Sequence, residues 1–275
     1  VRCVSCGHIT NRGFRYDAVP YSRKPNLMFN RGTNWSKFID EVSIRLIGHC
    51  PVHPTVIEVG YGDGSFLASM ADKNPKGRYI GFDPNGFRFE HDRIEFRAAL
   101  FDPGVDFADV KPDLIVTRHV LEHLTNPLAF LQKISFHAAV AHLEPRLYIE
   151  VPCVDTMVAT GRTVDLYYEH NSQFTTVSFQ RMLARARLEI LELGHGYQGE
   201  VVWALAKFPA NAEPRGYLDE ALQYNADARQ AHLTITRQLE ELWKSGRRVT
   251  VWGGTGKSAA FMNHYGLDRV RFPEV

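Results

Sequence analysis

A short stretch near residue 60 constrains the fold of this chain more than any other feature. Residues 55–59 are mostly β-branched and apolar, and they lead into three glycines, Gly60, Gly62 and Gly64, followed by the start of a helical pattern. A continuous apolar run of this kind is typical of a parallel strand that is buried on both faces. Glycines after such a strand let the backbone approach a ligand closely. The stretch therefore predicts a parallel sheet with a ligand cleft at its carboxyl edge.

The next predicted strand indicates which ligand the cleft binds. Residues 78–82 form a short apolar run that ends at Asp83 and Pro84. Asp83 follows the glycine turn by about 20 residues, a position from which a carboxylate accepts hydrogen bonds from ribose hydroxyls. Glu58 and Asp63 repel a pyrophosphate but attract the ammonium and sulfonium groups of S-adenosylmethionine, which is therefore the predicted cofactor. The residues predicted to bind it here are Glu58, Gly60, Gly62, Asp63, Gly64, Asp83 and Pro84.

Two further candidates for the same cleft follow later strands. Asp102 comes after the third predicted strand, where its carboxylate can accept a hydrogen bond from the adenine amino group. A purely structural role, as a turn residue before Pro103, is an equal alternative. His119 and His123 lie just beyond the fourth predicted strand, on the side of a sheet where cofactors commonly bind, although either can instead cap or fill the following helix. We include Asp102 and His119 among the predicted cofactor-binding residues.

Alternating strand and helix patterns extend this core to a whole domain. Apolar positions at helical spacing predict a helix over residues 35–47, Asn126 and Pro127 predict the start of another, and Ser178 is predicted to cap a third. The fold class is α/β, with a Rossmann-like sheet that is mostly parallel and whose last strand is antiparallel. The predicted strands are residues 55–60, 78–83, 94–100, 113–117, 146–151, 188–193 and 200–207.

Composition and charge narrow the class of partner. A net charge of +1 over 275 residues gives no tract suited to nucleic acid or an anionic membrane, and no apolar segment is as long as a membrane span. The first residues do not form a signal peptide, and four cysteines make no dense disulfide framework, which agrees with a reducing compartment. We expect a cytoplasmic protein with a small-molecule partner. Since both ends of the chain look cut, we also expect a fragment.

Each end of the chain carries a motif of its own. Cys3 and Cys6 have the spacing of a zinc knuckle, but a closed structural zinc needs four ligands. Zinc is therefore expected only if the missing ligands lie outside this segment. Near the other end, residues 248–252 predict a new strand that leads into the glycine-rich residues 253–258. That turn fails the phosphate-binding NTPase motif because Val251 replaces a required glycine, although its backbone N–H groups can still hold a phosphate.

Taken in order, these motifs resemble those of the S-adenosylmethionine-dependent C-methyltransferases that act on nucleotide-linked keto-deoxysugars. The matching motifs are Cys3-x-x-Cys6, residues 58–64, residues 81–84, residues 118–124, residues 167–170 and residues 251–258. The resemblance implies a partial zinc module in residues 1–20 and a class I S-adenosylmethionine methyltransferase domain in residues 21–210. It further implies a helical linker and the beginning of a C-terminal Rossmann-like domain in residues 211–275. The first half of the zinc module is missing, and residues 168 and 171–173 differ from the family's pattern.

The resemblance also implies the roles of individual residues. A histidine matching His170 removes a proton from the carbon beside a ketone, and tyrosines matching Tyr21 and Tyr167 with a carboxylate matching Glu169 orient the base and the sugar. Imidazole suits this task because it is neutral near pH 7 and accepts a proton, while a tyrosine hydroxyl can stabilise the enolate oxygen. The residues expected to bind the nucleotide sugar are Gly254, Gly256 and Lys257.

Other functions remain compatible with the sequence. The chain can be an O- or N-methyltransferase that acts on another small molecule, or a non-catalytic subunit that binds S-adenosylmethionine. A nicotinamide-dependent oxidoreductase is disfavoured by the acids around the glycine turn. The sequence leaves open the sugar, the nucleotide, the methylated carbon and the oligomeric state.

Overall fold

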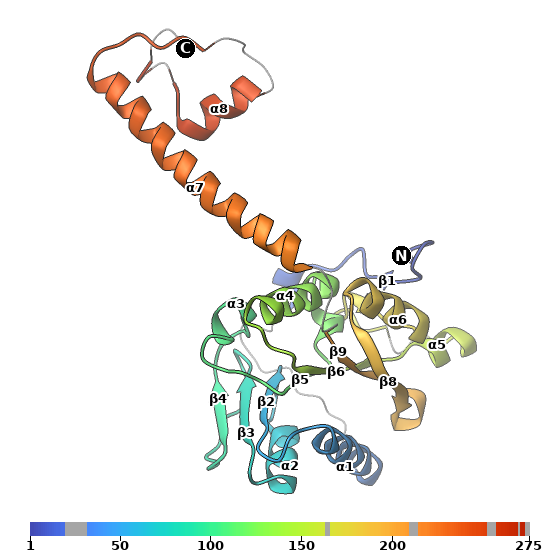
Figure 1. The fold of residues 1–275 in the computed structure, drawn as a ribbon. Helices are drawn as coiled ribbons and strands as arrows, with labels where there is room; N and C mark the ends of the chain where they lie inside the picture. Colours follow the sequence, from blue (N-terminus) through green and yellow to red (C-terminus); the bar gives the residue numbers. More distant parts are fainter. Residues whose placement is uncertain (20–31, 163–165, 209–213, 252–256, 269, 273–275) are drawn as a thin grey trace. The chain divides into compact units, whose positions relative to one another are not determined.

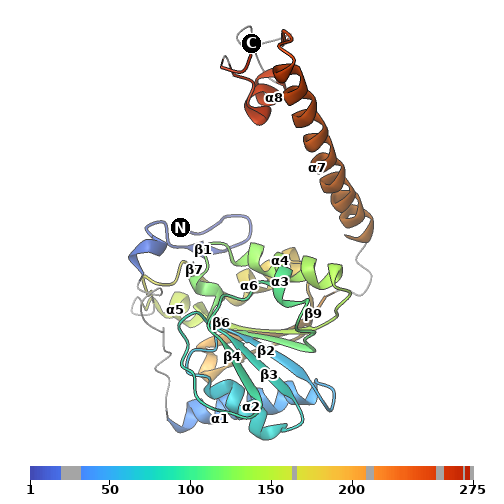
Figure 2. The same cartoon turned by 90° about the vertical axis from the view of Figure 1, so that its left-hand side faces the viewer.

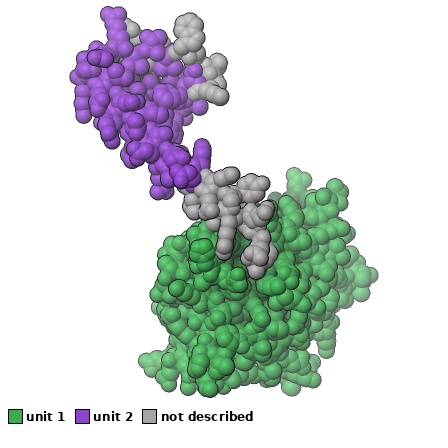
Figure 3. Space-filling view, in the orientation of Figure 1, with its two compact units in different colours: residues 1–212 green, residues 213–275 purple. Residues whose placement is uncertain are grey.

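The computed structural model describes residues 1–19, 32–162, 166–208, 214–251, 257–268 and 270–272. The chain divides into two compact units, Val1–Ala212 and Glu213–Val275, which are coloured separately in Figure 3. The first unit holds a seven-stranded sheet with helices on both faces, as Figure 1 shows. The described residues of the second unit form helices α7 (Pro214–Lys244) and α8 (Lys257–Tyr265).

The large sheet has the strand order β4-β3-β2-β5-β6-β9-β8. Across the sheet from β4 through β3, β2 and β5 to β6, neighbouring strands pair in parallel. Strand β9 runs antiparallel to both β6 and β8. This arrangement confirms the predicted fold class and adds that the antiparallel strand lies inside the sheet. The strands are β2 (Thr55–Val59), β3 (Arg78–Phe82), β4 (Ile94–Arg97), β5 (Leu114–Arg118), β6 (Arg146–Pro152), β8 (Glu189–Gly196) and β9 (Val201–Lys207). Because the chain proceeds outward in opposite directions from the β2–β5 pair, a crevice is expected at their carboxyl ends.

Helices cover the two faces of the sheet as separate layers. Helices α1 (Thr33–Gly48) and α2 (Ser65–Lys73) lie on one face, while α3 (Pro103–Asp106), α4 (Pro127–Val140) and α6 (Thr176–Arg185) lie on the other (Figures 1 and 2). A short helix, α5 (Asp155–Thr160), follows β6. The first layer packs around Leu46 and Tyr79, and the second around Leu131 and Phe179, all of them fully buried. The packing of these buried residues holds the sheet in place, and with it the edge on which the candidate site lies.

The helix starts follow local capping chemistry, with one correction. Asn126 caps α4 as predicted, because its side chain accepts a hydrogen bond from the backbone N–H of Ala129 at 3.0 Å. The prediction that Ser178 caps α6 is wrong. Thr175 is the N-cap, and Ser178 is the third helical residue, whose hydroxyl accepts from the N–H of Thr175 at 3.0 Å. Thr175 and Ser178 form a reciprocal capping box, in which the side chain of each accepts a hydrogen bond from the backbone N–H of the other. Both residues of such a pair, the cap and its partner three positions later, can be recognised in the sequence.

The N-terminal segment attaches beside the loop that carries residues 167–170. Strand β1 (Ile9–Thr10) pairs antiparallel with β7 (Ser172–Gln173), and the short helix η1 (Tyr16–Ala18) follows. The hydroxyl of Tyr168 donates to the backbone oxygen of Gly13 at 3.0 Å and accepts from the N–H of Arg15 at 3.1 Å. The segment therefore supports the shape of this loop from outside the main sheet.

The second unit differs from its prediction in one element. Residues 248–251 form no strand, although residues 248–252 were predicted to form one. Among the described residues of that unit there is no other strand with which they could pair, and an isolated strand leaves its backbone groups unsatisfied. The rest of the predicted turn, residues 252–256, lies outside the described residues.

No helix in the described part of the chain is long and apolar enough to cross a membrane.

Candidate functional site

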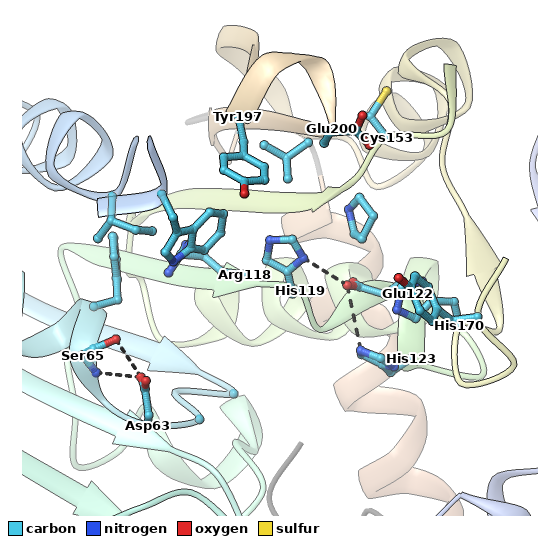
Figure 4. A pocket seen from close by; sticks show the side chains of 18 of the residues that line it. Asp63, Ser65, Arg118, His119, Glu122, His123, Cys153, His170, Tyr197 and Glu200 are labelled. Atoms are coloured by element: carbon cyan, nitrogen blue, oxygen red, sulfur yellow. Dashed lines mark hydrogen bonds and ion pairs between the residues drawn. The ribbon is translucent and has the colours of Figure 1, made fainter. Parts of the chain in front are cut away.

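A cavity of about 960 Å³ lies at the carboxyl ends of β2, β5 and β6 (Figure 4). The turn after β2 lines one part of it, and the segment after β5 and the loop before β7 line another. The cavity thus brings together residues that are more than one hundred positions apart in the sequence. The predicted site residues that line it are Glu58, Gly60, Gly62, Asp63, His119, Tyr167, Glu169 and His170.

The remaining predicted residues have other positions. Asp83 supports the glycine turn from behind, because its carboxylate accepts from the N–H of Gly62 at 3.1 Å and from that of Asn85 at 2.8 Å. Asp102 caps α3 through the N–H of Gly104 at 2.9 Å and pairs with Lys133 at 2.9 Å. The predicted residues that are not among those lining the cavity are Gly64, Asp83, Pro84 and Asp102. Their roles toward a cofactor stay predictions.

Several predicted residues lie outside what the structure describes. Tyr21, Gly254 and Gly256 fall in segments that are not described, and Lys257 begins α8 without a described side chain. Cys3 is exposed and Cys6 is half-buried. In the described parts of the chain, neither cysteine belongs to a group of three or more metal-ligating side chains. The zinc prediction and the nucleotide-sugar site therefore stay predictions.

The glycine turn has the backbone geometry that its sequence predicts. Gly60, Gly62 and Gly64 all have positive φ angles, of 74°, 56° and 73°, which residues with a side chain rarely adopt. Asp63 lies between the last two and accepts hydrogen bonds from both the N–H and the hydroxyl of Ser65, at 3.0 and 2.7 Å (Figure 4). The turn is thereby fixed as it enters α2.

Glu58 departs from the charge that the sequence argument gave it. The side chain is buried, and its Oε2 atom has no hydrogen-bond partner among the described residues. Burial raises the pKa of Glu58 to about 8, although the nearby Arg118 guanidinium opposes this shift. Near neutral pH the carboxyl group is therefore largely protonated. The difference arises from burial, which a motif in the sequence does not reveal.

A buried charge network lies under the middle of the cavity. Glu150 in β6 accepts hydrogen bonds from Arg118 at 3.0 Å and from the Tyr148 hydroxyl at 2.8 Å, and His119 Nε2 lies 3.0 Å away. Burial alone would raise the pKa of Glu150, but Arg118 and His119 lower it to about 2. Burial would likewise lower the pKa of His119, yet the carboxylates of Glu122 and Glu150 raise it to about 9. His119 also has a positive φ of 52°, a strained conformation that only a well-supported site retains.

A second polar cluster faces the cavity at the short helix η3 (Leu121–His123). Glu122 is buried, and its ion-pair contacts are His119 Nδ1 at 3.5 Å and His123 Nε2 at 3.9 Å (Figure 4). The ring of His170 meets that of His123 edge-on at 4.8 Å and lies 5.3 Å from that of Tyr167. Burial lowers the pKa of His170 to about 4, an effect that Glu122 partly opposes. Glu122, His123 and His170 each place one possible metal-ligating atom within 4.8 Å of the others.

This cluster adds a carboxylate to the expected surroundings of His170. The role of Glu169 in orienting the base stays a prediction; its described hydrogen-bond contact is through the backbone oxygen, 3.1 Å from His123 Nδ1. The carboxylate that shares a cluster with His170 is Glu122, which the sequence analysis did not select. The signal available in the sequence was an acid directly before His123, just after a predicted strand.

Sequence reasoning also missed the aromatic wall of the cavity. Trp35 packs edge-on against Tyr197, with ring centroids 5.1 Å apart, and the Arg118 guanidinium lies over Trp35 and Phe66 at 5.6 and 4.4 Å. Trp35 begins the amphipathic pattern of α1 and therefore resembled an ordinary core residue. No local pattern distinguishes an aromatic residue that packs in the core from one that lines a cavity.

We expect Gly60→Ala to disrupt the turn more than Gly62→Ala does. Both residues have positive φ, but a Cβ at Gly60 would lie 2.4 Å from Cγ2 of Val120, whereas one at Gly62 would meet nothing within 4 Å. Strain alone costs about 1–3 kcal/mol at either position, and only Gly60→Ala adds a clash at the cavity wall. Urea unfolding and S-adenosylhomocysteine titration of both variants measure the difference. Equal losses in the two variants would contradict this account.

A family model matches more than half of the chain. Residues 30–193 match a family model described as a methyltransferase domain. No curated protein matches the chain.

Solved structures of low identity are similar to part of the chain. An S-adenosylmethionine-dependent methyltransferase from Aquifex aeolicus is 14% identical, with 62% of this chain and 89% of that one covered and a TM-score of 0.45. Magnesium protoporphyrin IX methyltransferase from Synechocystis, solved with S-adenosylhomocysteine, is 15% identical, with 66% and 91% covered and a TM-score of 0.45. A Burkholderia thailandensis N1-methyltransferase of 1,6-didemethyltoxoflavin is 14% identical, with 62% and 76% covered and a TM-score of 0.42.

The family match covers the glycine turn, the whole parallel part of the sheet and the segment that carries His119 to His170. It confirms the predicted enzyme class and the predicted S-adenosylmethionine cofactor. The chain belongs to the family of methyltransferase domains and has the class I fold of the S-adenosylmethionine-dependent methyltransferases.

Proposed function

We propose that this chain methylates a carbon atom of a small ketone, a nucleotide-linked keto-deoxysugar, with His170 as the base that forms the enolate. The observation that carries the proposal is the position of His170 in the same cavity as the glycine turn, together with Tyr167 and Glu122. The sugar substrate is supported by the resemblance of residues 167–170 and 118–124 to sugar C-methyltransferases. The volume of about 960 Å³ is at the upper end for small-molecule sites, which favours room for a cofactor beside a substrate.

The residues at the turn suit S-adenosylmethionine. The unpartnered Oε2 atom of buried Glu58 can accept a hydrogen bond from a cationic group, and the backbone of the glycine turn gives close approach without side chains. Trp35 and Phe66 offer apolar faces nearby. Once bound, the cofactor supplies an electrophilic methyl group.

The residues at the other part of the cavity suit proton removal from carbon. The imidazole of His170 can take a proton through a ring nitrogen, and the Glu122 carboxylate beside it stabilises the imidazolium that forms. Developing charge on the ketone oxygen needs a hydrogen-bond donor, which the hydroxyl of Tyr167 can provide. His170 and its partners therefore prepare a carbon nucleophile within the cavity that also holds the turn.

Exchange of the substrate's α-hydrogen tests this function directly. Metal-free protein is incubated in deuterated water with S-adenosylhomocysteine and a panel of nucleotide-linked keto-deoxysugars, and label at the α-carbon is followed by NMR. Exchange with at least one sugar, followed by methyl transfer when S-adenosylmethionine replaces the product, is the expected result. Methyl transfer to oxygen or nitrogen without exchange would overturn the enolate route while leaving a methyltransferase.

Cofactor binding should release a proton from Glu58. Its pKa of about 8 means that the free protein holds this proton at pH 7, whereas a bound cation favours the ionised carboxylate. Calorimetry of S-adenosylhomocysteine binding at pH 7, in buffers with different heats of ionisation, should show release of about one proton. Affinity should increase from pH 6 toward 8 and then level off. Glu58→Gln should remove the part of the proton release and of the pH-dependent affinity that comes from Glu58. If this variant releases as many protons on binding as the unchanged protein, the assignment is contradicted.

A further inference from the structure

We propose that Glu122, His123 and His170 form a binding site for one divalent transition-metal cation at the wall of the cavity. Nothing in the methyltransferase assignment requires such a site. The three side chains come from two segments, η3 and the loop before β7, and they gather at one place in Figure 4, apart from Asp63 and Ser65. Their possible ligand atoms lie within 4.8 Å of one another, so modest rotations of the side chains bring all three onto one ion.

The buried carboxylate of Glu122 is the first argument for a cation. The residue is 1% exposed, and neither of its oxygens receives a hydrogen bond from any residue that the structure describes. A buried carboxylate without hydrogen bonds is costly, and the ion pairs of Glu122 with His119 and His123, at 3.5 and 3.9 Å, are long. A cation between Glu122 and the two histidines would occupy the unused oxygen lone pairs.

The tautomer of His123 is the second argument. Its Nδ1 atom lies 3.1 Å from the backbone oxygen of Glu169, and because a carbonyl can only accept, Nδ1 carries the proton when the ring is neutral. Nε2 is then the atom with the lone pair, and it faces Glu122 Oε1 at 3.9 Å. Metal-bound histidines typically donate their second ring N–H to a backbone carbonyl in this way. The contact therefore orients His123 as a ligand in advance.

The chemistry of the set selects the kind of ion. Two imidazole nitrogens and one carboxylate oxygen suit zinc, cobalt, nickel or ferrous iron, whereas magnesium and calcium prefer ligand sets made of oxygen. Three protein ligands leave at least one coordination position for water or a substrate oxygen. His123 and His170 are half-buried and line the cavity, so an ion can reach them.

The other group of possible ligands is less suited. Cys153, Asp155 and His195 also come within 4.8 Å of one another. The Thr176 hydroxyl already forms hydrogen bonds with two members of that group, because it donates to Asp155 at 2.5 Å and lies 2.8 Å from His195 Nε2. Its polar atoms are thus satisfied by the protein, unlike those of Glu122.

The inference goes beyond the proposed function and does not rest on it. A metal ion on His170 occupies the lone pair that proton removal needs, so the two uses of this residue exclude each other. The cation-loaded protein should therefore lose α-hydrogen exchange, and a chelator should restore it. If the metal-free protein shows no exchange, the proposed function fails while the binding data still decide the metal site.

Titration of the metal-free chain with Co²⁺ tests the site. Visible d–d absorption should saturate at about one equivalent, without the near-ultraviolet thiolate band that cysteine ligands give. Glu122→Gln, His123→Asn and His170→Asn should each weaken binding by at least about tenfold. His195→Asn is the matched control, because it removes a histidine from the other group, and binding should stay unchanged.

Two results would overturn the proposal. One is Co²⁺ affinity that is retained in both His123→Asn and His170→Asn. The other is a thiolate band, which would place the ion at Cys153 or at Cys3 and Cys6. Thermal unfolding and S-adenosylhomocysteine affinity of each variant show whether a loss reflects misfolding. His170→Asn keeps the test decisive if buried Glu122 tolerates no change, because His170 lies on a loop and is only half-buried.

Discussion

Replacing His170 with asparagine should lower α-hydrogen exchange and methyl transfer by about 10²- to 10⁴-fold, the usual contribution of a general base. Asparagine keeps a polar group of similar size but cannot take a proton from carbon. Affinity for S-adenosylhomocysteine should stay within about threefold, because the glycine turn that is proposed to hold it belongs to a different part of the chain. Single-turnover assays and calorimetry of the same variant measure the two quantities separately.

A matched variant separates the base from its neighbour in sequence. Glu169→Gln should cost much less activity, because the described contact of Glu169 is made by its backbone oxygen, which the substitution keeps. Turnover that survives in His170→Asn would exclude this histidine as the base. A loss in Glu169→Gln as large as that in His170→Asn would instead support the role that the family resemblance gave to Glu169.

Replacing Glu150 with alanine should destabilise the fold by about 3–5 kcal/mol. Glu150 is fully buried, and its loss leaves Arg118 and His119 without the carboxylate that now contacts both at 3.0 Å. Urea unfolding with an unchanged m-value measures the effect. The matched control is Glu192→Ala, which breaks partly exposed contacts with Arg45 at 2.8 Å and His49 at 2.7 Å and should cost at most about 1 kcal/mol.

A double variant and a pH series test the same network. The double variant Arg118→Met with Glu150→Leu should regain much of the stability that Glu150→Ala loses, because neither position then carries a buried charge without a partner. The pKa of Glu150 is depressed to about 2 in the folded chain, so its stabilising effect is present above its ordinary pKa. That stability, on the order of 3 kcal/mol, should disappear as pH falls from about 5 toward 2. If Glu150→Ala and Glu192→Ala lose similar stability, the network does not hold the sheet edge together.

Much of the fold could be predicted because its signals are local. The run at residues 55–59, the glycines after it and Asn126 act through backbone sterics and hydrogen bonds between near neighbours, and the structure places each as expected. Prediction was less successful where a pattern needed a distant partner. Residues 248–251 have a strand's composition but no neighbouring strand among the described residues of their unit.

The sequence by itself determined the glycine turn, the order of strands and helices and the methyltransferase class, because each depends on spacing along the chain. Only the tertiary structure decided the charge state of Glu58 and brought Glu122, rather than Glu169, into the cluster with His170. Ionisation depends on how much water and which charges surround a group, and side-chain partners depend on which segments meet in space. Neither quantity is a property of neighbouring residues in the sequence.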